Sequence, residues 1–194
     1  MRQLFYFIGI FIFCVACNND VVPRPRGFLR LEYPVASYAR TDIDNTPFSF
    51  EANQLATNIT SKKIKSTTES YGIDIVYPSL KGTIYLTYKS IDHNRDNLMA
   101  FLRDAQNFTQ KHTAKADEII DSKYENKLDN VYGMFYQVGG NAASQSQFYV
   151  TDSVEHFLTG SLYFYAKPNY DSIFPAAKYL EKDIKHIMET IKWK

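Results

Sequence analysis

The chain has 194 residues, a formal net charge of +1 and only two cysteines, Cys14 and Cys17. Its Lys and Arg residues form no basic stripe, so nucleic acid is not expected to be a partner. Cys14 lies in an N-terminal segment that is expected to be removed, with cleavage directly before Cys17. The remaining chain then has no second thiol for a disulfide or a thiolate metal site. One hydrophobic core must therefore hold the exported chain together.

The N-terminal segment predicts export and lipid attachment. An uncharged apolar run from Leu4 to Phe13 follows a single basic residue, Arg2. About ten apolar residues suit the core of a signal peptide, whereas a membrane-spanning helix needs roughly 20. Alanine directly before Cys17 is typical of a bacterial lipoprotein signal, so residues 1–16 are expected to be removed and Cys17 to carry acyl chains such as palmitate. An ordinary secretory signal or a short membrane anchor is the alternative.

Residues 17–26 are expected to form a lipidated N-terminus and a tether, followed by a single domain over residues 27–194. Pro23 and Pro25 favour an extended backbone in the tether. Asn18 directly follows the lipidated cysteine. Because an aspartate at that position favours retention in the inner membrane, Asn18 favours the outer membrane for the anchor.

The first half of the domain shows the period-two alternation that is typical of β-strands. Ile73, Ile75 and Tyr77 share one face of a segment, and a turn with Pro78 and Gly82 follows it. Strands are expected over residues 28–33, 47–51, 71–77 and 83–88. The Lys-rich residues 62–65 are expected to form a solvated strand edge or a loop.

The period then changes to three or four residues, which predicts a helix from Asn94 to His112, capped by Asp92 or Asn94. Further strands are expected over residues 118–124, 131–138, 147–151 and 157–166. A second amphipathic helix is expected over residues 174–192, with Pro175 in its first turn. These elements predict an α+β fold, a largely antiparallel sheet packed by two amphipathic helices, similar to the α/β/α arrangement of Mog1/PsbP-like domains.

Small polar residues between two aromatic strands predict a contact surface. Residues 139–146 combine glycines with hydrogen-bonding side chains, which lets another surface approach closely. The candidate partner surface consists of Gly140, Asn141, Ser144, Asp152 and His156. A long hairpin loop without a partner is the alternative.

The residues are compatible with two other classes of function. Ser144, Asp152 and His156 could form a hydrolytic triad, although Ser144 lies outside a G-x-S-x-G turn. The four histidines show no metal-ligand spacing, and neither a metal nor a cofactor is expected. Strands rich in Tyr and Phe could instead line a site for a small ligand or a lipid.

Blocks of sequence along the whole mature chain resemble the GldD family of gliding-motility lipoproteins. The blocks, in chain order, are PRPRGFLRL (23–31), PFSFE (47–51), KHTAKAD (111–117), VYG (131–133), GNAAS (140–144), QFYVTDS (147–153), HFLTGSLYF (156–164), PNYDS (168–172) and DIKHIMETIKW (183–193). The resemblance implies a non-catalytic, membrane-anchored protein of the cell envelope. Such a protein supports gliding and the linked type IX secretion machinery through contacts with other envelope proteins. The resemblance supplies no catalytic residues.

Overall fold

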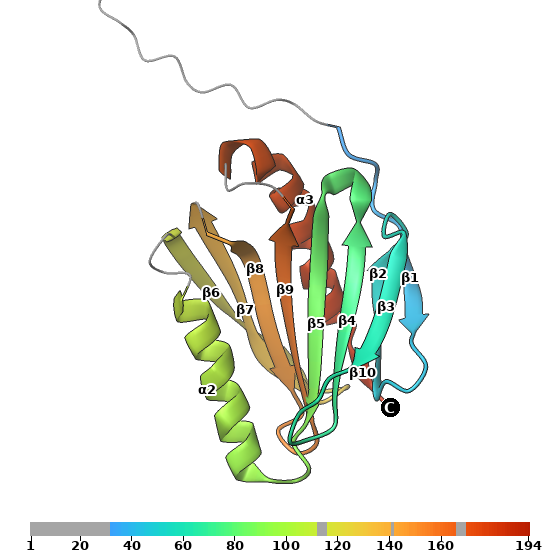
Figure 1. Ribbon diagram of the computed structural model, residues 1–194, viewed down its shortest axis with the longest axis vertical. Helices are drawn as coiled ribbons and strands as arrows, with labels where there is room; N and C mark the ends of the chain where they lie inside the picture. Colours follow the sequence, from blue (N-terminus) through green and yellow to red (C-terminus); the bar gives the residue numbers. More distant parts are fainter. Residues whose placement is uncertain (1–31, 112–115, 141, 166–169) are drawn as a thin grey trace, which may run out of the picture.

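The structure is a computed structural model that describes residues 32–111, 116–140, 142–165 and 170–194. A seven-stranded antiparallel sheet, in the order β3-β4-β5-β9-β8-β7-β6, forms its centre (Figure 1). Its strands are β3 (Asn58–Lys63), β4 (Ser70–Tyr77), β5 (Gly82–Ser90), β6 (Ala116–Asn126), β7 (Val131–Gly140), β8 (Ser144–Thr151) and β9 (His156–Phe164). A short 3-10 helix, η1 (Pro78–Leu80), connects β4 to β5.

The two faces of this sheet are covered differently. Helix α2 (Arg95–Lys111) lies on one face, whereas helix α3 (Tyr170–Glu189) packs on the other, beside a small sheet ordered β1-β2-β10 (Figure 1). The strands of the small sheet are β1 (Tyr38–Asp42), β2 (Phe48–Asn53) and β10 (Lys192–Trp193). The main core lies between the large sheet and the layer of α3 and β2. This arrangement confirms the predicted α+β class with an antiparallel sheet and two helices.

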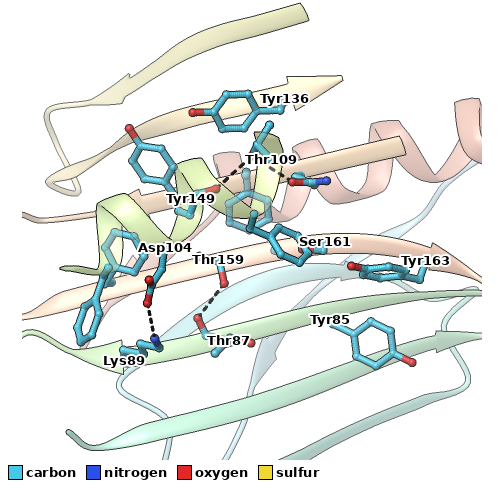
Figure 2. Close-up of a pocket in the computed structure, with 17 residues that line it drawn as sticks. Tyr85, Thr87, Lys89, Asp104, Thr109, Tyr136, Tyr149, Thr159, Ser161 and Tyr163 are labelled. Carbon is cyan, nitrogen blue, oxygen red and sulfur yellow. Dashed lines mark hydrogen bonds and ion pairs between the residues drawn. The ribbon is translucent and has the colours of Figure 1, made fainter. Parts of the chain in front are cut away.

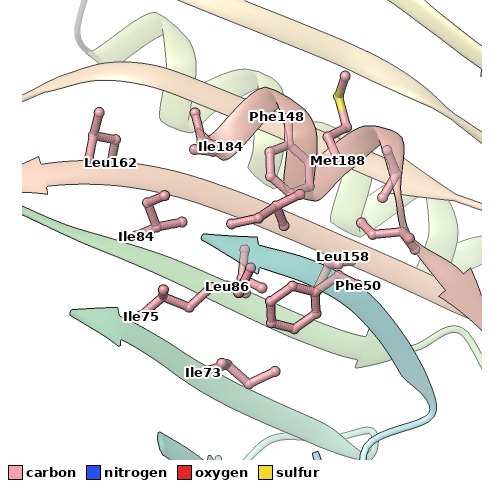
Figure 3. Packing of buried hydrophobic residues seen from close by; sticks show 14 of the residues in the cluster. Phe50, Ile73, Ile75, Ile84, Leu86, Phe148, Leu158, Leu162, Ile184 and Met188 are labelled. Carbon is pink, nitrogen blue, oxygen red and sulfur yellow. The ribbon is translucent and has the colours of Figure 1, made fainter. Parts of the chain in front are cut away.

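Aliphatic and aromatic side chains fill the main core, as the alternation in β4 and β5 predicts (Figure 3). Ile75 and Ile84 lie opposite each other in the register of β4 and β5 and are fully buried. From α3, Ile184 and Met188 pack onto this face. Burying an aliphatic side chain of this size stabilises the fold by about 1.5–3 kcal/mol.

Helix α2 begins where the sequence predicts. Asn94 caps it, because its Oδ1 accepts a hydrogen bond of 2.8 Å from the backbone N–H of Asp96. Phe101 is buried against Phe157 of β9 and Ile91 in a second, smaller apolar cluster. The predicted last residue of this helix, His112, lies outside the described residues.

Three predicted elements differ from the structure. The strand predicted over residues 28–33 lies largely outside the described part, and its described residues Glu32 and Tyr33 are not in a strand; β1 begins at Tyr38. Strand β3 carries Lys62 and Lys63 of the Lys-rich residues at the edge of the large sheet, as predicted, but the sequence did not predict its full extent because its side chains are polar. The helix predicted over residues 174–192 runs from Tyr170 to Glu189, and Lys192 belongs to β10. Pro175 therefore lies inside α3 rather than in its first turn, where it costs one backbone hydrogen bond.

Candidate functional site

The segment predicted to be a long hairpin loop is mostly strand. Strand β7 continues to Gly140 and β8 begins at Ser144, so the prediction of a loop over residues 139–146 is wrong. The side chains of Ser144, Gln145 and Ser146 are buried, and the Ser144 hydroxyl donates to the backbone carbonyl of Ser146 at 3.3 Å. Asn141 lies outside the described residues. Gly140 is buried as well. Gly140 and Ser144, the two described partner candidates in this segment, therefore do not lie on the surface.

Asp152 and His156 have structural contacts at the opposite end of β8. The Asp152 carboxylate accepts hydrogen bonds from the backbone N–H groups of Val154, Glu155 and His156 at 2.8–2.9 Å, which organises the turn between β8 and β9. The buried His156 ring forms a 2.9 Å hydrogen bond with the Tyr88 hydroxyl and stacks on Trp193. His156 therefore contributes to the core rather than to an exposed surface.

Strand register separates the residues of the predicted hydrolytic triad. Ser144 pairs with Tyr163, near the end of β9, whereas His156 begins that strand. Seven residues of extended strand span roughly 23 Å, so the serine hydroxyl and the imidazole cannot exchange a proton directly. The alternative of a hydrolase built on Ser144 and His156 is wrong. The same register separates Gly140 and Ser144 from Asp152 and His156, so the predicted partner residues do not form one surface.

The described residues show neither a metal cluster nor a membrane span. In the described ranges, no group of three or more His, Cys, Asp or Glu side chains is placed to hold a metal ion. Among these same residues, no helix combines the length and the apolar composition that crossing a membrane requires.

A cavity of about 320 Å³ lies between α2 and the large sheet (Figure 2). Side chains of β5, β7, β8 and β9 form its floor, and α2 forms one wall. Four tyrosines contribute from four different strands; they are Tyr85, Tyr136, Tyr149 and Tyr163. Hydroxyl groups of Thr87, Thr159 and Ser161 lie between them. A volume of this size is at the lower end of the range for small-molecule sites.

The tyrosine rings are arranged around the cavity by contacts with one another. Tyr85 and Tyr163 meet edge to face, with ring centroids 5.9 Å apart, and Tyr149 stacks on Phe157 at 5.8 Å. Burial raises the pKa of Tyr149 and of Tyr163. Burial, with smaller contributions from the neighbouring Tyr149 and Asp121, raises the pKa of Tyr136 to about 12. These phenols therefore stay protonated at neutral pH and can donate hydrogen bonds.

Gln147 is the most buried polar side chain of the cavity wall, with 2% of its surface exposed. Its Oε1 accepts a hydrogen bond of 3.1 Å from the Thr109 hydroxyl of α2. Its Nε2 is buried and has no hydrogen-bonding partner among the residues that the structure describes. The Gln147 side chain thus joins the floor of the cavity to α2.

The charged side chains that line the cavity form one pair. Lys89 Nζ lies 3.7 Å from an Asp104 carboxylate oxygen and 4.6 Å from the centroid of the Phe101 ring. The ammonium charge is thus balanced by the carboxylate and placed over an aromatic face. The cavity has no net charge from its lysine and aspartate, and it offers aromatic faces with neutral donors and acceptors.

The comparison with protein families agrees with the resemblance found in the sequence. The family model described as gliding motility lipoprotein GldD matches residues 18–193, which is nearly the whole chain. No curated protein and no solved structure matches the chain significantly. Because the match covers far more than half of the chain, this protein belongs to the GldD family of gliding-motility lipoproteins.

Proposed function

We propose that this protein is a non-catalytic lipoprotein that supports gliding motility and the associated type IX protein secretion machinery through contacts with other envelope proteins. The observation that carries this proposal is the family match over residues 18–193. The separation of Ser144 from His156 removes the one catalytic arrangement that the sequence suggested.

The acyl chains on Cys17 hold one end of the protein in a membrane, and the outer membrane is favoured, with the domain facing the periplasm. Two or more acyl chains give stable anchoring where a single chain is marginal. Residues 32–37, the first part of the chain that the structure describes, lie beside the connection from β2 to β3 (Figure 1). This end of the domain is therefore the one nearest to the tether.

Partner contacts are assigned to the opposite end of the sheet, where the β6–β7 and β8–β9 turns lie (Figure 1). Leu128, at the tip of the first turn, has 95% of its surface exposed, and Val154 of the second turn is half exposed. Asp152 fixes the shape of that second turn through its backbone hydrogen bonds. A protein surface at this end reaches furthest from the anchoring membrane and presents apolar side chains for burial by a partner.

Photo-cross-linking in intact cells tests this assignment. A photo-reactive amino acid at Leu128 is expected to yield a discrete adduct with another envelope protein. The same amino acid at Ser79, an exposed residue of η1 at the tether end, serves as the matched control and should yield none. Adducts at Ser79 with none at Leu128 would place the partner at the wrong end and contradict the assignment.

A further inference from the structure

Strands β5 and β9 carry two chemically different faces. The face toward α3 presents aliphatic side chains such as Ile84, Leu86 and Leu162, all buried in the main core. The face toward α2 presents Tyr85 and Tyr163 together with hydroxyl-bearing threonine and serine. A helix that only needs to be packed onto a sheet is held best by aliphatic side chains that fill the space at native density. The second face is instead left partly open and lined with rings and hydroxyls.

Helix α2 covers this second face unevenly. Its apolar contacts gather around Phe101, which packs on Phe157 at a centroid distance of 5.6 Å. Toward the C-terminal end of the helix, Thr109 reaches the floor through its hydrogen bond to Gln147. The cavity lies between these contacts, with the Tyr136 and Tyr149 rings on one side and Tyr85 and Tyr163 on the other (Figure 2).

The Gln147 amide joins the floor of the cavity to helix α2. Its carbonyl oxygen accepts a hydrogen bond from the Thr109 hydroxyl, and its Nε2 is buried away from the open space. Gln147 therefore fixes the shape of the cavity, whereas the groups that a ligand can touch are the tyrosine rings and the hydroxyls of Thr87, Thr159 and Ser161.

We propose that the cavity under α2 binds an uncharged sugar ring, such as a terminal hexose or N-acetylhexosamine of an envelope glycan. The C–H faces of a pyranose lie flat on tyrosine rings, and its hydroxyls match the hydroxyls of Thr87, Thr159 and Ser161. The Asp104 carboxylate, 3.7 Å from Lys89 Nζ, offsets the positive charge of the lysine, so the cavity does not favour an anionic ligand. This site is separate from the protein-contact role proposed above and does not depend on it.

An acyl chain of similar volume fits the rings but not the polar groups. It would cover the hydroxyls of Thr87, Thr159 and Ser161 without giving them a hydrogen-bonding partner, at a cost for each polar group that it buries. A sugar supplies both kinds of contact at once, since it carries apolar faces and hydroxyl edges. The lining therefore discriminates between the two chemistries.

Titration calorimetry on the full lipidated protein tests the proposal. The protein is held in a polyoxyethylene detergent, because a detergent with a sugar headgroup would compete for the site. The probes are glucose, galactose, mannose and N-acetylglucosamine, with glucuronate as the anionic sugar and palmitate as the acyl chain. At least one neutral sugar is expected to bind with a dissociation constant of about 1 mM or lower, and glucuronate at least about tenfold more weakly.

Two variants and a matched control assign the binding to the cavity. Tyr163→Ala and Tyr136→Ala should each weaken sugar binding about tenfold or more, because each removes an aromatic ring that lines the cavity. Tyr132→Ala changes a tyrosine on the same strand and the same face that does not line the cavity, and it should bind as the wild type does. Thermal melting checks that each variant is folded. Binding of palmitate alone, no binding of any neutral sugar, or equal loss in the Tyr132 control would each overturn the proposal.

Discussion

Replacing Asp183 by alanine should lower the free energy of unfolding by about 3 kcal/mol and the melting temperature by roughly 10 °C. Asp183 is 1% exposed, and its two oxygens accept hydrogen bonds from the Tyr38 hydroxyl at 2.7 Å and from Asn53 Nδ2 at 2.8 Å. The carboxylate thus connects α3 to β1 and β2. Its removal leaves two donors without this acceptor and a small cavity in the layer that joins the tether end to the core. Thermal and urea unfolding followed by circular dichroism measure the change.

Lys182→Ala is the control for this substitution, because Lys182 precedes Asp183 in the same helix and is exposed. Its unfolding free energy should stay within about 0.5 kcal/mol of the wild type. An equal loss in both variants would show that helix α3 responds to any change of side chain, and the hydrogen-bond account would then be contradicted.

The pH dependence of the Asp183 effect has a defined sign. Burial raises the pKa of Asp183 above its ordinary value of 3.8, and the hydrogen bonds from Tyr38 and Asn53 oppose this rise. The folded protein therefore binds this proton more tightly than the unfolded chain. The resulting stabilisation is fully present below 3.8 and is lost as the pH rises through the raised pKa. The difference in unfolding free energy between wild type and Asp183→Ala should consequently widen as the pH is lowered from neutral toward 3.8.

The second large effect is expected at Gly133 of β7. A Cβ atom there would overlap the backbone carbonyl of Tyr149 in β8, and it would lie 2.9 Å from the Cα of Val150. Backbone on a paired central strand cannot move aside without breaking the ladder, so Gly133→Ala should cost about 3 kcal/mol. Because Tyr149 also lines the cavity, the substitution should weaken sugar binding as well.

Gly139→Ala, on the same strand, is the matched control. The nearest atom to its added Cβ is the Glu118 carbonyl oxygen at 3.7 Å, which is an ordinary contact. Its effect on the unfolding free energy should stay within about 1 kcal/mol. If urea unfolding gave the two alanine variants equal stability, the close approach of β7 and β8 at Gly133 would be contradicted.

The sequence predicts those parts of the fold that local pattern determines. Period-two alternation marks β4 and β5, and Asn94 marks the start of α2, because burial on one face and end-capping leave a direct trace in neighbouring residues. Strands β3 and β10 have no such trace. Strand β3 is polar and lies at a sheet edge. Strand β10 has only two residues, and they pair with residues of β2 that are far away in the sequence.

The candidate site is less predictable because it depends on register. Small residues such as Gly139 and Ser144 are typical of turns, yet β7 and β8 extend through most of residues 139–146. The Ser144 side chain is fully buried. Tyr85 and Thr87 share a face in the sequence pattern alone. Only the antiparallel pairing of β5 with β9 places Tyr163 and Thr159 beside them, and only α2 turns that face into a cavity.

Single-cell gliding speed tests most directly the claim that this protein works from a membrane. Residues 18–194, exported behind a cleavable signal without the Cys17 attachment site, replace the wild-type protein at matched abundance. We expect a stable protein that is released into the aqueous fraction and cells that no longer glide, while the wild-type chain restores gliding and incorporates labelled palmitate. Normal gliding speed with the unlipidated chain would contradict the claim that the protein works from a membrane.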